Sequence, residues 1–203
     1  MGGTPPPATP APVADRFATH AVDNQPPPLS PYDAWTTDVP LREAVAREGG
    51  DWANEALAGY GIVVGGEMME LGRLANENPP RLRAFDAQGH RIDEVEFHPA
   101  YHRLMELGVR AGVSGLAWRV EHRPGAHVAR AAMMFLHNQA DAGTSCPLTM
   151  TYACVPALRH APGLADDWLD RIASPIYDPR QVPGDRKAGI TVGMGMTEKQ
   201  GGS

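Results

Sequence analysis

The segment AHVARAAMMFLHNQA, residues 126–140, is apolar on nearly every side of a helix at its centre. Its side chains Val128, Ala132, Phe135 and Gln139 recur at helical spacing. A helix that is apolar all round is typically buried, because no side of it gains from contact with water. We therefore expect residues 126–140 to form a central helix, with Phe135 inside the protein.

Helical patterns also precede this segment. Asp38 is a suitable N-cap for a helix that ends at Gly49-Gly50. A second pattern repeats at i, i+4, i+7 and i+11, as one face of a helix does, and stops at Asn78-Pro79-Pro80. Its members are Val64, Met68, Leu71 and Ala75. Residues 81–97 are expected to be an irregular excursion with a turn at Gln88-Gly89.

Three more helices are expected around and after the central one. The first opens at Pro99 and contains three glycines that would weaken it by about 1 kcal/mol each, which suggests close backbone packing against a neighbour. These glycines are Gly108, Gly112 and Gly115. The second carries a stripe through Met150, Ala153, Cys154, Ala157 and Leu158, with a kink or interruption at Pro156. Leu164, Trp168 and Ile172 mark the last helix, so residues 38 to about 174 should form an all-α domain.

The composition divides the chain into three parts. Residues 1–37 are rich in proline and should form a disordered or extended arm. Residues 38–183 should form a helical domain. In residues 184–203, the short apolar run Ala188–Met196 favours a buried strand that begins another domain. The expected fold is thus mainly α, a helical bundle followed by the first strand of a β domain.

Charge and cysteine content exclude some functions for this segment. The 203 residues contain 18 basic and 24 acidic side chains, a net charge of -6, and nucleic-acid binding needs clustered Lys and Arg. Cys146 and Cys154 are eight residues apart in one helical stripe, about 12 Å and too far for a disulfide, so both read as small core residues. Without a signal-like or membrane-spanning apolar stretch, we expect a cytoplasmic protein that does not enter the membrane.

The last residues carry the clearest functional pattern. In a strand, Ile190, Val192, Met194 and Met196 would share one face, and Thr191, Gly193, Gly195 and Thr197 the other. A row of glycine and threonine leaves room for a flat ligand beside the backbone. The pattern alone also fits a tight strand-to-loop turn without a ligand. It is no dinucleotide-binding fingerprint, because the third glycine is missing.

The segment Met-Thr-Glu-Lys-Gln-Gly-Gly-Ser, residues 196–203, resembles the T-E-x-x-x-G-S segment of acyl-CoA dehydrogenases, and its Lys-Gln-Gly form resembles their AidB-like branch, flavoproteins of the response to DNA alkylation. The resemblance extends collinearly from about Thr19 to Ser203. Further matching segments are Thr19-His20, Asn24-Gln25-Pro26, Glu43-Ala44-Val45, Arg47-Glu48-Gly49, Glu70–Asn76, Asn78-Pro79-Pro80, Phe97-His98-Pro99 and Cys146-Pro147.

This resemblance implies a flavin site. In the family, the T-E-x-x-x-G-S segment ends the first strand of a central β domain and binds FAD. Thr197 would then hydrogen-bond the pyrimidine edge of the flavin, and Ser203 would lie near the FAD pyrophosphate and the acyl-CoA thioester arm. The implied cofactor-binding residues are Met194, Gly195, Met196, Thr197, Glu198, Lys199, Gln200, Gly201, Gly202 and Ser203.

The resemblance also implies an activity and partners. The family removes an α-proton from an acyl-CoA with a glutamate base and transfers a hydride from the β-carbon to flavin N5. That glutamate belongs to a C-terminal helical domain absent from these 203 residues, so no residue here is assigned as the catalytic base. This chain is expected to be the N-terminal part of such a protein, inactive alone. A homotetramer is the expected assembly.

Two other hypotheses remain open. The AidB-like resemblance also fits a protective flavoprotein that binds double-stranded DNA through its C-terminal domain and has little dehydrogenase activity. The fragment alone could instead serve only as a helical assembly domain. His98 and His102 stand at i, i+4, but because the sequence places no third ligand, capping or surface roles are favoured over a metal site.

Overall fold

Eight α-helices and one β-hairpin form the part of the chain that the structure describes. The structure is a computed structural model and describes residues 19–21, 23–195, 197 and 199. A π-helical turn, Val64–Met68, joins α2 to α3. The elements are α1 (Val39–Arg47), α2 (Asn54–Val63), α3 (Met69–Glu77), β1 (Arg81–Phe85), β2 (Arg91–Glu96), α4 (Pro99–Ala111), α5 (Leu116–Arg119), α6 (Ala126–Ala140), α7 (Ser145–Leu158) and α8 (Pro162–Ile172).

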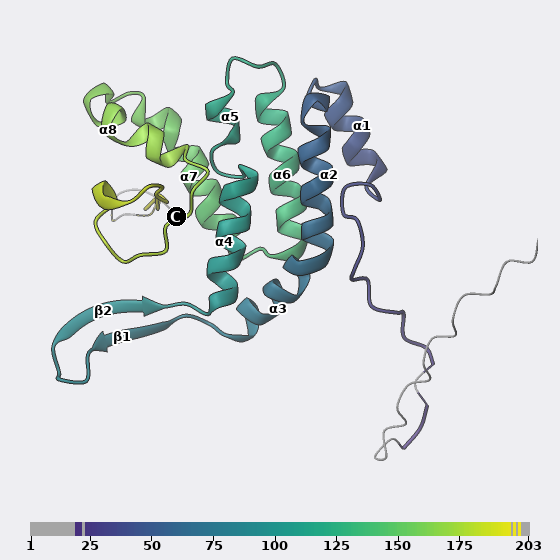
Figure 1. Cartoon of the computed structure of the whole chain (residues 1–203), viewed down its shortest axis with the longest axis horizontal. Coiled ribbons are helices and arrows are strands. Elements are labelled where there is room, and N and C mark those ends of the chain that lie inside the picture. Colours follow the sequence, from purple (N-terminus) through teal and green to yellow (C-terminus); the bar gives the residue numbers. More distant parts are fainter. Residues whose placement is uncertain (1–18, 22, 196, 198, 200–203) are drawn as a thin grey trace, which may run out of the picture.

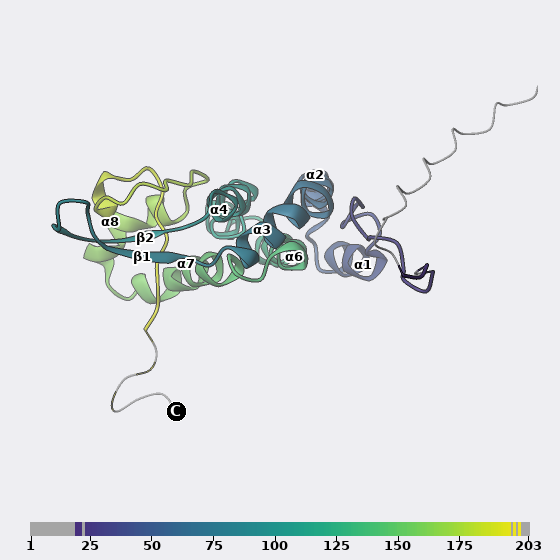
Figure 2. The same cartoon turned by 90° about the horizontal axis from the view of Figure 1, so that it is seen from below.

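The helices form two layers, and α6 lies in the middle of one of them. Figure 2 shows α1, α6 and α7 in one layer and α2 and α4 in the other. Helix α6 packs against α1, α2, α5 and α7. The hairpin extends away from one end of the bundle, beside the segment that follows α8 (Figure 1). The mainly α fold expected from the sequence is therefore confirmed.

Helix α6 is central, as expected, but its buried face differs from the expected one. Ala129, Met133 and Leu136 are at most 1% exposed, whereas Phe135 is 52% exposed. Val128 is only half-buried and Gln139 is exposed. The prediction that Phe135 lies inside was wrong, because a helix that is apolar on all sides does not reveal which side its neighbours cover.

Residues 81–97 are not an irregular excursion, and the all-α prediction was wrong there. Strands β1 and β2 pair antiparallel, with Leu82 opposite Val95 and with Arg81 and Arg83 opposite Glu96 and Glu94. Gly89 has a φ of +86° at the turn. The strands are short and mostly charged, so their alternation is weak in the sequence. Opposite charges across the strands help to pair them.

The caps follow the sequence closely. The Asp38 carboxylate accepts from the Leu41 N–H at 2.9 Å, as an N-cap does. Helix α3 ends at Glu77, just before Asn78-Pro79-Pro80. Helix α4 is shorter than expected and ends at Ala111, because Gly112 adopts a left-handed φ of +92° that glycine tolerates. The expectation that Gly112 and Gly115 lie inside this helix was therefore wrong. Gly108 does pack closely, as expected, since a Cβ there would lie 2.6 Å from Leu148 Cδ1.

Helix α7 continues through Pro156 instead of stopping there. A proline inside a helix lacks the N–H that would bond to the carbonyl four residues earlier, here that of Tyr152. The Trp118 indole Nε1 donates to this Tyr152 carbonyl at 3.0 Å. A side chain from α5 thus replaces the missing bond, which allows α7 to reach Leu158.

The two sides of α6 should respond differently to truncation. We expect Leu136→Ala to lower the free energy of unfolding by about 2–5 kcal/mol, because it empties a fully buried site. Phe135→Ala in the same helix should cost well under half of that, since the ring is half exposed. Urea unfolding of both variants measures the difference. Equal costs would contradict the assigned face of α6.

Candidate functional site

On its outer side, helix α7 carries a stripe of small or flexible side chains. Cys146, Ala153 and Ala157 are exposed and Met150 is half-buried, at positions i, i+4, i+7 and i+11. These four residues are called the α7 stripe below. The expectation that Cys146 is a core residue was therefore wrong, whereas Cys154, on the inner side of α7, is buried as expected. Both thiols are free.

The segment that follows α8 returns to α7, and every second amide from Ile190 to Met194 bonds to a residue of α8 or α7. The Ile190 N–H donates to the Arg171 carbonyl at 3.2 Å. The Val192 N–H donates to the Thr151 hydroxyl at 3.0 Å, and the Met194 N–H donates to Met150 Sδ at 3.4 Å. Residues 190–194 therefore lie along α7, beside the α7 stripe.

Side chains in this segment alternate as the sequence indicates, but no strand forms in its described part, residues 188–195. Ile190 and Val192 pack against the small core of Cys154, Val155 and Ile172. Thr191 and Gly193 are exposed. A strand requires backbone pairing with another strand, whereas the amides described above bond to helices.

The expected ligand face of this segment is open. A Cβ placed on Gly193 or Gly195 would meet no atom within 4 Å in the described part of the chain. Gly195, Thr197 and Lys199 are exposed, and Met194 is 44% exposed. The other expected flavin residues lie outside the described residues: Met196, Glu198, Gln200, Gly201, Gly202 and Ser203.

A stack of four planar groups holds the inner side of α7 in place. The Arg130 guanidinium lies 3.8 Å from the Tyr152 ring, Tyr152 stacks on Trp118 at 5.0 Å, and Arg159 lies 5.1 Å from Trp118. Arg130 also donates from Nε to the Val113 carbonyl at 2.7 Å, and burial lowers its pKa. Sequence reasoning missed this stack, because its members come from three separate segments: α5, α6, and α7 with its C-cap.

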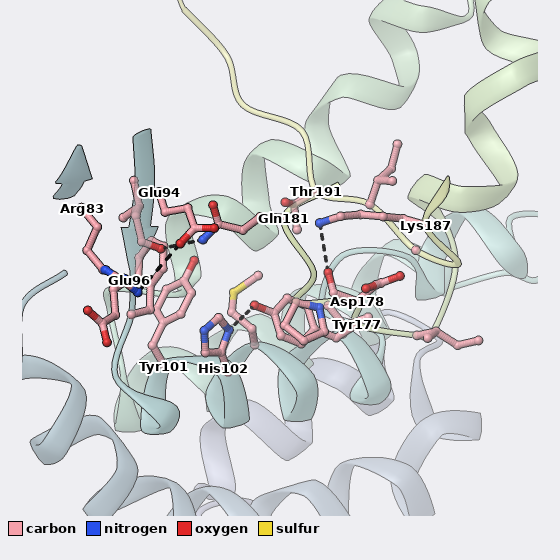
Figure 3. A pocket seen from close by; sticks show the side chains of 18 of the residues that line it. Arg83, Glu94, Glu96, Tyr101, His102, Tyr177, Asp178, Gln181, Lys187 and Thr191 are labelled. Carbon is pink, nitrogen blue, oxygen red and sulfur yellow. Dashed lines mark hydrogen bonds and ion pairs between the residues drawn. The ribbon is translucent and has the colours of Figure 1, made fainter. Parts of the chain in front are cut away.

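A cleft of about 400 Å³ opens between the hairpin, α4 and the segment after α8 (Figure 3). Phe97 and Tyr101 stack in its wall with ring centroids 4.1 Å apart. The His102 Nδ1 and the Tyr177 hydroxyl are 2.8 Å apart, and burial lowers the pKa of His102. Thr191 forms part of the lining and lies on the open face of residues 188–195, which are called the return segment below.

One hydrogen bond joins the segment after α8 to the hairpin at the cleft, and further polar contacts lie within that segment. Gln181 Nε2 donates to the Val95 carbonyl at 3.0 Å and joins the post-α8 segment to β2. Lys187 Nζ donates to the Asp178 carbonyl at 3.1 Å (Figure 3). The Arg180 side chain pairs with the Asp178 carboxylate and lowers its pKa. These contacts fix the post-α8 segment before it reaches α7.

The two histidines have separate structural roles. His98 caps α4 by accepting from the Ala100 N–H at 3.1 Å, so the expected capping role is confirmed. His102 bonds to Tyr177 in the cleft wall. Over the described residues, no group of three His, Cys, Asp or Glu side chains is arranged to hold a metal ion. None of the described helices is both long and apolar enough to cross a membrane.

Comparison with known proteins places this arrangement in a family. Residues 24–179 match the family model described as the N-terminal domain of the adaptive response protein AidB. The chain belongs to the AidB N-terminal domain family. The "putative acyl-CoA dehydrogenase AidB" of Escherichia coli K12 is 50% identical over 189 residues, 92% of this chain and 35% of that protein.

Other proteins are similar at lower sequence identity. "Acyl-CoA dehydrogenase family member 11" of Caenorhabditis elegans is 30% identical over 155 residues, 72% of this chain and 23% of that protein. The crystal structure of C. elegans ACDH-11 in complex with C11-CoA superposes with a TM-score of 0.72 at 25% identity, over 91% of this chain and 32% of that one. The apo form of Bd2924 shares the fold, with a TM-score of 0.70 at 22% identity over 84% and 33% of the two chains. This AidB-type domain thus spans about a third or less of the length of these relatives.

The Thr151 hydroxyl should control how firmly the return segment is held. Thr151→Val removes the acceptor for the Val192 N–H, so we expect deuterium exchange of that amide to accelerate roughly 2- to 12-fold, the effect of losing about 0.5–1.5 kcal/mol. Thr151→Ser keeps the hydroxyl and should exchange like the original protein. Exchange measured on residues 188–195 tests this. An unchanged rate in Thr151→Val would refute the anchoring role.

Proposed function

We propose that this chain is the N-terminal part of an FAD-dependent flavoprotein of the acyl-CoA dehydrogenase type. The observation that supports it most is the return segment, held on α7 through alternate amides while its glycine and threonine face stays open. In this proposal residues 1–37 are an arm, residues 38–183 are the helical domain, and residues 184–203 begin the FAD-binding β domain. Pairing with further strands would turn residues 188–196 into the first strand of that domain.

The residues present fit a flavin on the open face. Gly193 and Gly195 leave space where any side chain would stand, and Thr197, two residues after Gly195, is exposed. Met194 to Ser203 would hold FAD, with Thr197 at the pyrimidine edge and Ser203 near the pyrophosphate. When bound, the flavin would supply the hydride-accepting step in the α,β-dehydrogenation of an acyl-CoA.

The α7 stripe suits the acyl part of such a substrate. Cys146, Met150 and Ala153 present small or flexible apolar surface beside the return segment, and methionine adapts to irregular apolar partners. A relative of the same fold was solved with C11-CoA. Ser203 is proposed to contact the thioester arm. The catalytic base is proposed to be a glutamate of a further domain, so this chain alone would be inactive.

The assembly and location follow from the same proposal. Phe135, 52% exposed on α6, and the α7 stripe are apolar surface that further domains or subunits would cover. We propose a homo-oligomer, a tetramer as in the dehydrogenase family, located in the cytoplasm. Its substrate partner is an acyl-CoA thioester.

Flavin titration of the longer protein tests the proposal. Gly195→Val places a branched side chain on the open face and should obstruct FAD binding without unfolding the helical domain. Thr197→Val removes one hydroxyl and should weaken FAD binding by about 0.5–1.5 kcal/mol. Ile190→Ala, on the packed side, is the control and should cost mainly stability.

One outcome of the flavin titration would contradict the proposal. If both Gly195→Val and Thr197→Val bind FAD as tightly as the original protein, the flavin does not lie on this face. The 203-residue chain alone should purify without flavin, since most of the proposed β domain is absent from it. Stoichiometric flavin in that chain would also contradict the proposal.

A second candidate function is a protective flavoprotein that binds double-stranded DNA, with little dehydrogenase activity. It is favoured by the match to an adaptive response family. The net charge of -6 makes this domain a poor DNA-binding surface, so the DNA contacts are proposed to lie in a C-terminal domain.

We therefore expect this chain to show no saturable binding to a short fluorescent DNA duplex, even at low salt. The longer protein should bind with an affinity that falls steeply as salt increases. Anisotropy titrations of both proteins measure this. Binding by the 203-residue chain alone would show that the DNA contacts were assigned to the wrong domain. Absence of binding by the longer protein would reject the second candidate.

A further inference from the structure

A chain of hydrogen bonds runs through the core from α2 to the turn between α6 and α7. The Tyr60 hydroxyl lies 2.6 Å from His137 Nδ1, and His137 Nε2 lies 2.8 Å from the Thr144 hydroxyl. That hydroxyl also contacts the Asp141 carboxylate. Tyr60, His137 and Thr144 are 6%, 0% and 1% exposed. The chain is complete within the described residues and depends on no ligand.

The direction of every proton in this chain is fixed by chemistry. A carboxylate only accepts hydrogen bonds, so the Thr144 hydroxyl donates to Asp141. The Thr144 oxygen then accepts from His137, which places the imidazole proton on Nε2. Nδ1 is left with a lone pair, to which the Tyr60 hydroxyl donates. A neutral imidazole satisfies all four groups at once.

The same chain shapes the α6–α7 turn. The Asp141 carboxylate accepts from the Gly143 N–H at 3.2 Å and from the Thr144 N–H at 2.7 Å. The Ser145 hydroxyl donates to the Asp141 carbonyl at 3.0 Å. Thr144 is the N-cap residue of α7, two positions before Cys146. Hydrogen bonds therefore connect a core histidine to the N-cap of α7, two residues before the α7 stripe begins.

We propose that Tyr60, His137, Thr144 and Asp141 form a proton-sensitive latch, which holds the α6–α7 turn closed while His137 is neutral and releases the turn when His137 takes up one proton. A proton on Nδ1 would point at the Tyr60 hydroxyl, which must then turn away and lose its acceptor inside the core. A buried donor without a partner is unfavourable. Opening the turn lets the imidazolium reach water.

The residues around His137 support release of the turn on protonation. Gly108 of α4 and Leu148 of α7 lie on its uncharged side and offer no partner for a second ring proton. Tyr60 and Asp141 are the titratable groups that face it; Asp141 also raises the pKa of Tyr101 on α4. Glu67, on the segment between α2 and α3, is paired with Arg103. Burial lowers the pKa of His137 to about 4, an effect that the Asp141 charge opposes only in part.

The sign of the pH dependence follows. The folded pKa of about 4 is lower than the ordinary value of about 6.5, so the open turn binds the proton more readily than the closed one. The latch is fully closed above pH 6.5. Its closure weakens about tenfold per pH unit as the pH falls from 6.5 towards 4, because opening takes up one proton.

Hydrogen exchange of the full 203-residue chain, read on peptides covering residues 137–148 and corrected for intrinsic rates, tests the latch. We expect protection to fall about tenfold per pH unit between pH 6.5 and 4, while peptides from α1 and α8 keep theirs. His137→Gln should remove this dependence. His160→Gln, at an exposed histidine, is the matched control and should behave like the original chain.

Three results would overturn the proposal: protection that does not change with pH, the same fall in His137→Gln, or a parallel loss in α1 and α8 that shows global unfolding. If His137→Gln does not fold, nitrogen NMR of histidine in the original chain decides. The proposal requires an Nε2–H tautomer that stays neutral to about pH 4. An Nδ1–H tautomer, or a charged ring at pH 6, would refute it.

Discussion

The candidate site depends on how α7 packs against α6. Arg130 of α6 lies on the Tyr152 ring of α7, and the Trp118 indole supplies the donor that Pro156 cannot. These contacts orient α7 so that Leu148 and Thr151 face inward and the α7 stripe faces outward. The inward Thr151 hydroxyl then holds Val192, so the position of the return segment follows from how α7 is packed.

Much of this fold could be predicted from the sequence where local chemistry determines it. Asp38 and the Asn78-Pro79-Pro80 stop define helix ends through groups within a few residues. The buried face of α6 could not be predicted in the same way, since an apolar helix fits a core from any side. The hairpin was missed because its strands are short and charged, and their pairing depends on residues about 10 positions apart, such as Arg83 and Glu94.

The same distinction between local patterns and long-range contacts applies to the candidate site. The alternation of Ile190 and Val192 against Thr191 and Gly193 was readable from the sequence, because it needs only a period of two. Its anchors were not readable, since they join residue 192 to residue 151 and residue 194 to residue 150. The core histidine was missed because its partners come from α2 and from the α6–α7 turn, and their hydrogen bonds appear only once the helices pack.

In the proposed full-length protein, further domains cover the α7 stripe and the open face of the return segment. Maleimide labelling of Cys146, read by mass spectrometry at low protein concentration, tests this coverage most directly. Cys146 is exposed and Cys154 is buried, with the pKa of its thiol raised by burial, so Cys154 is an internal reference. The account predicts that Cys146 reacts readily in the 203-residue chain and far more slowly in the longer protein. Equal labelling of Cys146 in both would contradict it.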